Sequence, residues 1–141
     1  MRCGRLNVAA ELDRYVLELK LKKIKLADKF ELFDEYWSPR IVGELNGQYV
    51  KLAKFKGEMV WHSHKDEDEF FQVIKGSIVI HLKDQSVALH EGECYIVPKG
   101  VEHKPEAVEE AHVMMFEPKT TAHTGTTESD LTVELEEQEW I

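Results

Sequence analysis

The chain has 141 residues, 43% of them hydrophobic, a length and composition that suit one domain with a single core. Its 27 acidic and 18 basic residues give a formal net charge of −9, which repels the phosphate backbone of nucleic acids. No stretch approaches the roughly 20 apolar residues of a membrane span. We therefore expect neither nucleic acid nor a membrane as a partner.

The two cysteines, Cys3 and Cys94, lie far apart in the sequence and predict no disulfide framework, which suits a reducing cytosol. The opening MRCGRLNVAAELDRY contains no uninterrupted apolar segment of the kind found in secretory signals. We therefore expect a cytoplasmic protein. Cys94 has no neighbouring thiol in the sequence and is predicted to be a small buried apolar residue.

The N-terminal region is predicted to form an arm. Ala9, Leu12, Val16 and Leu19 recur every three or four positions, which predicts a short amphipathic helix within the first 20 residues. Beyond this segment the period is lost, and a Ser-Pro pair disfavours helix just before it. We interpret residues 1–40 as a helical or extended arm that packs on the main body.

From Ile41 onwards the sequence changes to short β-prone runs separated by turn residues. Asn46-Gly47 separates IVGEL from QYVKLAKF, which is a strong hairpin signal. Further strands are predicted at FFQVI, SIVIHL, SVALH, CYIVP and AHVMMFEP. Many short strands with regularly spaced turns favour an all-β antiparallel sandwich or barrel over alternating βα units. We assign this barrel to residues 41–118.

Two further features concern the surroundings of the barrel. The SIVIHL strand is apolar on both faces, with Ile78 and Ile80 on one face and Val79 on the other. Such a strand is covered on both sides, and a second subunit would supply the outer cover, so we expect a homodimer. Residues 119–141 are Thr-rich and then acidic, and we interpret them as a C-terminal arm whose last two residues dock on the body.

The stretch GEMVWHSHKDEDEFFQVIKG, residues 57–76, is the strongest candidate for a functional site. In an extended segment, residues i and i+2 point to the same face about 7 Å apart, so His62 and His64 can converge on one ion. On a helix this spacing would separate them, because a helical metal pair needs residues i and i+4. Neutral imidazole is a strong donor for Zn, Fe, Ni, Cu or Mn.

Here the sequence resembles the two motifs of the cupin superfamily. The first motif corresponds to Gly57, His62, His64, Glu69 and Gly76, and the second to Gly92, Pro98, Gly100 and His103. The resemblance implies a double-stranded β-helix, the cupin or jelly-roll barrel, around one metal. It also implies four metal ligands, namely His62, His64, Glu69 and His103. Four residues instead of five separate the first glycine from the first histidine, and Ala107 replaces an Asn; neither change removes a ligand.

The choice of the acidic ligand has an alternative. The KDEDE segment offers four carboxylates, of which Asp66 and Glu67 are interpreted as a solvated loop. Asp68 fits a shorter form of the first motif. Glu69 is preferred because Gly76 then follows after six residues and because its side chain has the longer reach.

Other residues are assigned less specific roles. The histidines outside the motifs are interpreted as surface or packing residues: His81, His90, His112 and His123. His123 could reach the mouth of the site if the C-terminal arm folded over. Four residues that share faces of predicted strands are candidates for the walls of a substrate pocket, with core packing as the alternative: Tyr49, Lys51, Phe55 and Phe71.

Three imidazoles and one carboxylate leave one or two positions open on a divalent transition metal such as Fe, Mn, Zn or Ni. A metal with open positions can polarise a bound oxygen or acidify a water. We therefore expect an enzyme that acts on a small polar molecule, of the dioxygenase type or of the sugar isomerase or lyase type. The alternative is a non-catalytic cupin that binds or senses a small ligand. The sequence identifies no general base.

Overall fold

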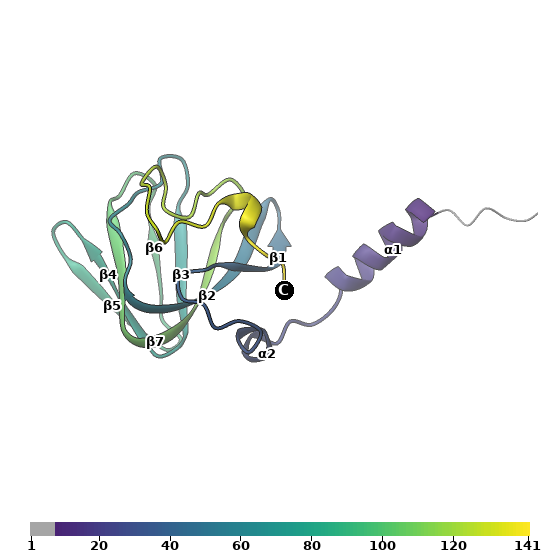
Figure 1. Cartoon of the computed structure of the whole chain (residues 1–141), viewed down its shortest axis with the longest axis horizontal. Helices are drawn as coiled ribbons and strands as arrows, with labels where there is room; N and C mark the ends of the chain where they lie inside the picture. The colour runs from purple at the N-terminus through teal and green to yellow at the C-terminus, as the bar shows by residue number, and fades with distance from the viewer. Residues whose placement is uncertain (1–7) are drawn as a thin grey trace, which may run out of the picture.

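The computed structural model describes residues 8–141, so the expectations for Cys3 lie outside the described residues. The described part of the chain begins with helix α1 (Val8–Lys20), which confirms the predicted amphipathic helix. None of its residues is buried, and the helix stands away from the body (Figure 1). The part of the arm that packs on the body is a second helix, α2 (Leu26–Phe30), which the sequence analysis did not predict.

Helix α2 is short, and tertiary packing explains why it forms. Its only buried residue, Phe30, joins Phe33, Val42 and Leu52 in an apolar cluster outside the barrel. The Phe30 ring also stacks on His112, with ring centroids 4.3 Å apart. A five-residue helix has little stability of its own in water, so this packing holds it in place.

The body is an antiparallel β-structure, as predicted. Its strands are β1 (Arg40–Leu45), β2 (Gln48–Glu58), β3 (Glu69–Lys75), β4 (Ser77–Leu82), β5 (Ser86–His90), β6 (Cys94–Val97) and β7 (His103–Pro118). The strand order is β1-β2-β7-β3-β6, and β4 pairs with both β7 and β5. The 16-residue β7 is therefore the central strand, because it pairs with β2, β3 and β4. The predicted all-β cupin or jelly-roll barrel is confirmed.

The β1–β2 hairpin forms where the sequence predicts it. Asn46 and Gly47 connect the two strands with φ angles of 50° and 78°. Two consecutive positive φ angles are the requirement of a type I′ turn, which matches the twist of paired strands.

The barrel interior follows the two-residue period of the strands. Its buried apolar residues include Ala53 and Phe55 of β2, Val73 of β3 and Val113 of β7. The prediction that Cys94 is buried was wrong, because this residue is exposed. Its side chain lies on the face of β6 opposite to the buried Val97, an odd number of residues away.

The C-terminal arm folds back along the barrel, where the yellow end of the chain crosses one end of the strands (Figure 1). Its last residues dock as predicted: the Ile41 N–H donates to the Glu139 carbonyl at 2.8 Å, and the Ile141 N–H donates to the Ile41 carbonyl at 3.0 Å. Within residues 8–141 neither helix has the length and apolar character needed to cross a bilayer. The homodimer stays a prediction.

Candidate metal centre

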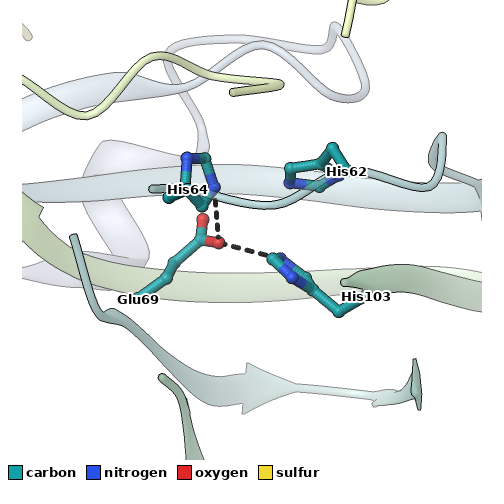
Figure 2. Close-up of side chains that lie close together, drawn as sticks. All are labelled: His62, His64, Glu69 and His103. Carbon is teal, nitrogen blue, oxygen red and sulfur yellow. Dashed lines mark hydrogen bonds and ion pairs between the residues drawn. The ribbon is translucent and has the colours of Figure 1, made fainter. Parts of the chain in front are cut away.

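Four side chains of the two cupin-like motifs come together at one end of the barrel (Figure 2). Glu69 begins β3 and His103 begins β7. His62 and His64 lie between β2 and β3 in an irregular segment, not in a regular strand as the i, i+2 argument assumed. An isolated antiparallel bridge still holds the first histidine, because the backbone N–H groups of His62 and His103 donate to each other's carbonyls at 3.0 and 2.9 Å.

The potential ligand atoms of His62, His64, Glu69 and His103 all lie within 4.8 Å of one another. All four residues are buried, with at most 5% of any of them exposed. Glu69 Oε2 accepts hydrogen bonds from His64 Nε2 at 3.1 Å and from His103 Nε2 at 3.0 Å (Figure 2). We call these four side chains the His₃Glu cluster.

Hydrogen bonds to the backbone orient two of the rings. His62 Nδ1 donates to the Val60 carbonyl at 2.9 Å, and His103 Nδ1 donates to the Val101 carbonyl at 3.0 Å. A neutral imidazole carries only one N–H, so the bond to Val60 leaves the lone pair of His62 on Nε2. Metal-ligating histidines are commonly held by such a hydrogen bond from their other nitrogen.

His103 provides a test of whether a metal fits this site. Both of its nitrogens face oxygen atoms, Val101 O on one side and Glu69 Oε2 on the other. A neutral ring can donate only one of these two hydrogen bonds, so a positive charge is needed between Nε2 and the carboxylate. A proton meets this need, and so does a metal ion bound by both atoms. The donor set therefore fits a divalent transition metal.

Electrostatics within the cluster favour the protonation states that a metal requires at His62 and Glu69, but not at His64. Burial lowers the pKa of His62 to about 4, which keeps its imidazole neutral at pH 7. Burial also lowers the pKa of His64, but the hydrogen bond to Glu69 and its charge outweigh burial and raise that pKa overall. For Glu69, burial raises the pKa, and hydrogen bonds from His103 and His64 lower it by more, so the carboxyl is ionised.

The alternative acidic ligand lies elsewhere. Asp68 is exposed, and its Oδ1 accepts the backbone N–H of Lys99 at 2.8 Å. Its carboxylate is therefore used in a surface turn. Glu69 is the carboxylate that the fold brings to the three imidazoles.

The four candidate pocket residues lie in different environments. Phe71 is buried with its ring centroid 6.2 Å from that of His103, so it lies beside the cluster. Phe55 stacks on Trp37 at 4.3 Å and belongs to the apolar core. Lys51 is fully buried at the polar end of the barrel. Tyr49 is half-buried with Trp140 against its edge.

The partner of Lys51 was missed by the sequence analysis. Lys51 Nζ and Glu117 Oε1 are 2.6 Å apart, and neither residue is more than 3% exposed. Phe70 is paired with Phe116 in the antiparallel register. Glu69 precedes Phe70 and Glu117 follows Phe116, so these two acids lie opposite each other. Burial and the negative charge of Glu69 together raise the pKa of Glu117 to about 7, although Lys51 acts to lower it.

The position of Glu117 could have been found in the sequence. In AHVMMFEP the residues Val113, Met115 and Glu117 alternate on one face of the strand, so two inward apolar residues predict that the acid also points inward. An acid on a buried strand face requires a partner.

The remaining histidines were interpreted as surface or packing residues. His90 is exposed, and His81 lies between Ser86 Oγ and Glu106 Oε2 at 2.9 and 2.6 Å, so both agree with that interpretation. His123 differs, because burial lowers its pKa to about 4 and the charges of cluster residues act on it. The arm that carries it contacts the segment of the first two cluster histidines, through Thr120 to Glu67 and Thr127 to the Trp61 carbonyl.

Comparisons with known proteins agree with this fold. Residues 49–119 match the family model of the cupin domain. The crystal structure of a cupin-2 domain containing protein from Shewanella frigidimarina NCIMB 400 is 48% identical, with a TM-score of 0.68, and the match covers 72% of this chain and 98% of that one. Protein NMB1881 from Neisseria meningitidis is 28% identical, with a TM-score of 0.64 and coverage of 69% and 99%.

Among curated proteins, the uncharacterized protein YdbB from Bacillus subtilis (strain 168) is 41% identical over 64 residues. This match spans 45% of the chain and 57% of YdbB, so the chain covers little more than half of that relative. The family model covers half of the chain, and the strand order and the His₃Glu cluster agree with it. The protein belongs to the cupin family.

Proposed function

We propose that this cupin is a mononuclear metal-dependent enzyme that acts on a small polar molecule. The metal would be held by the His₃Glu cluster. The main support is the surroundings of His103, whose two ring nitrogens each face an oxygen atom. A neutral ring can donate to only one of these oxygens, so a positive charge is needed between Nε2 and Glu69. A divalent metal bound there polarises substrate oxygens and stabilises negative charge that develops on them.

The protein's own groups would contribute orientation and exclusion of water. The Val60 and Val101 carbonyls hold the rings of His62 and His103 through their Nδ1 atoms. Phe71 lies beside His103 and provides an apolar wall. In a buried site of this kind, charges interact more strongly than they do in water.

Metal analysis tests this proposal. Protein purified from cells without metal supplementation should contain about one equivalent of a divalent transition metal. His64→Ala and Glu69→Ala should lose most of it, whereas His90→Ala, which changes an exposed histidine, should keep it. Equal metal contents in all four proteins, or no binding of Fe, Mn, Zn or Ni by the parent after reconstitution, would contradict the proposal.

The identity of the bound metal also separates the two candidate reaction classes. Oxygen-dependent cleavage by a dioxygenase requires Fe(II), so it predicts oxygen consumption by iron-loaded protein only. Isomerase or lyase chemistry on a sugar or a carboxylate needs a Lewis acid, so it predicts turnover without oxygen and with Zn, Mn or Ni as well.

A non-catalytic module that binds or senses a small ligand is the second candidate. It is favoured by burial, since the cluster residues are at most 5% exposed in the folded chain. Thermal shift with sugars, sugar phosphates and dicarboxylates distinguishes the two functions. Stabilisation of the metal-loaded protein without turnover would support the binding module, whereas turnover would support the enzyme.

A further inference from the structure

The outer face of the sheet carries an apolar row that crosses four strands. The row takes one residue each from β2, β7, β3 and β6, paired across the strands in the order Val50, Phe116, Phe70 and Ile96. The last three line a hollow of about 320 Å³, and Ile96 is 54% exposed. We call this surface the outer hollow. A sheet face that meets water usually carries polar residues, so this row indicates a surface that another element covers.

Helix α2 covers only the neighbouring part of the same face. Its Phe30 packs in the apolar cluster that contains Leu52, against which Met114 also packs. Leu52 and Met114 are paired across β2 and β7, two positions along each strand from the apolar row. The three apolar residues of the outer hollow belong to neither of the two apolar clusters of the protein.

Helix α1 has the opposite problem, because it carries an apolar stripe and no surface to pack on. None of its residues is buried. The stripe is formed by five residues that are each between 42% and 73% exposed: Val8, Leu12, Tyr15, Val16 and Leu19. On another side of the helix Arg14 and Glu18 form an ion pair at 3.2 Å. A helix of this length is marginal in water unless its apolar face is packed, so α1 requires a partner surface.

The charges around the helix and the hollow are complementary. Residues 19–27 contain four lysines and no acid: Lys20, Lys22, Lys23 and Lys25. Lys25 is paired with Asp28, whereas the other three form no ion pair within residues 8–141. The outer hollow is edged by three acids, Asp66, Glu67 and Asp68, against one base, Lys99. An apolar helix followed by lysines therefore matches an apolar surface bordered by carboxylates.

The position of α1 favours a second copy over the helix's own barrel. Ile24 lies against β1, where its Cδ1 is 3.6 Å from the position that a Cβ on Gly43 would take. Strand β1 and strand β6 are at opposite ends of the strand order, and α2 packs on the face between them. From β1 the helix points away from the body (Figure 1). To reach its own hollow, α1 would have to turn back across α2, whereas in a dimer each helix can extend onto the other copy.

We propose that residues 8–25 dock on the outer hollow of a second copy of this chain, and that the two copies exchange these segments reciprocally. The apolar stripe of α1 lies on the row of Phe116, Phe70 and Ile96, in the manner of an amphipathic helix bound in a groove. The lysines that follow α1 face the acids at the edge of the hollow. Reciprocal exchange gives a closed two-fold dimer. This proposal does not depend on the metal site.

Sedimentation equilibrium of the full-length protein measures the dissociation constant of the dimer. We expect a dimer for the parent, and Leu12→Ser should weaken it at least about tenfold, because each dimer loses two apolar contacts. Leu17→Ser is the matched control, since this leucine is 55% exposed on another side of α1. Ile96→Ser should weaken the dimer as Leu12→Ser does, whereas Val108→Ser, at a residue that is 78% exposed and outside the hollow, should leave it unchanged. A monomeric parent, or a dimer unaffected by either Leu12→Ser or Ile96→Ser, would overturn the proposal.

Charge reversal distinguishes a second copy from the helix's own chain. Lys23→Glu and Asp66→Lys should each weaken the dimer several-fold at low ionic strength, because each places like charges at both interfaces. In an equimolar mixture of the two variants, both interfaces of a mixed dimer pair opposite charges, so the mixture should contain more dimer than either variant alone at the same total concentration. Docking of α1 on its own chain predicts no gain on mixing, and that result would contradict the exchange.

Discussion

The two ends of the barrel interior differ sharply, although the same three strands build both. Toward one end, β2, β7 and β3 contribute Phe55, Val113 and Val73, which pack in the apolar core. Toward the other end, the same inward faces carry Lys51, Glu117 and Glu69. Moving four residues along a strand keeps the side chain on the same face but replaces apolar packing by charge. The apolar end therefore stabilises the fold, and the polar end carries the candidate metal ligand Glu69 and the buried Lys51–Glu117 pair.

A substitution at the apolar end alone tests this difference with the largest expected effect. Phe55 is buried against Trp37, and Phe55→Ala should lower the free energy of unfolding by about 3–5 kcal/mol, as expected for a large cavity. Urea denaturation followed by circular dichroism measures this loss. The folded fraction should still bind one metal. Lost metal binding with full stability would instead make Phe55 a wall of the site.

The buried ion pair tests the polar end. Lys51→Met leaves the Glu117 carboxylate buried without its partner and should destabilise the protein by about 3 kcal/mol at pH 8. Lys51→Met combined with Glu117→Leu removes both charges and should recover most of that loss. A double variant no more stable than Lys51→Met would show that the unpaired Glu117 carboxylate does not cause the loss of stability.

The contact between the arm and the site has a matched pair of glycines. Gly125 has a φ of 58° and no room for a Cβ, whereas Gly92 has a φ of 82° and open space. Both substitutions by alanine strain the backbone, but only Gly125→Ala also pushes the arm from Ser63. We expect a loss of about 2–3 kcal/mol for Gly125→Ala and about 1 kcal/mol for Gly92→Ala in chemical denaturation. Equal losses would mean that the close approach is unimportant.

The smallest effect concerns pH. Burial lowers the pKa of His123 from 6.5 to about 4, so below pH 6.5 the unfolded chain takes up a proton that the folded chain refuses until about pH 4. Stability from this group is thus present above pH 6.5 and lost as the pH falls. Between pH 7 and pH 5 the metal-free parent should lose about 2 kcal/mol more than His123→Gln. Identical pH dependence in the two proteins would contradict the burial of this neutral ring.

Glu117 acts in the opposite direction, which is why the comparison with a variant is needed. Its pKa is raised to about 7, so its contribution is present at low pH and is lost as the pH rises from about 4.5 to 7. It is unchanged in His123→Gln, as is the buried His62, so both cancel in the difference between the two proteins.

The parts of the structure that sequence alone predicts are those encoded by local patterns. The Asn46-Gly47 hairpin follows from backbone requirements of the turn. The cluster residues follow from two motifs with fixed spacing, and the fold brings them together through β3, β7 and the segment between β2 and β3. Helix α2 was not predictable in this way, because contacts with Phe33 and Leu52, not its own five residues, explain it.

The surroundings of the four cluster residues depend on contacts between distant parts of the sequence, so the sequence analysis did not predict them. Lys51 and Glu117 are 66 positions apart in the sequence, and only the β2–β7 register brings them together. His123 was interpreted as a surface or packing residue, with a folded-over arm as the alternative, because nothing in the TTAHTGTT sequence shows that the arm contacts the segment of Trp61 and Glu67. Cys94 was misassigned because the face of a four-residue strand depends on one position of register.

Anomalous diffraction from crystals of the metal-loaded protein tests the central claim most directly. The account predicts a single strong peak about 2.0–2.2 Å from the Nε2 atoms of His62, His64 and His103 and from an oxygen of Glu69. A peak at any other place, or the same four side chains hydrogen-bonded to one another with no ion after metal loading, would contradict it.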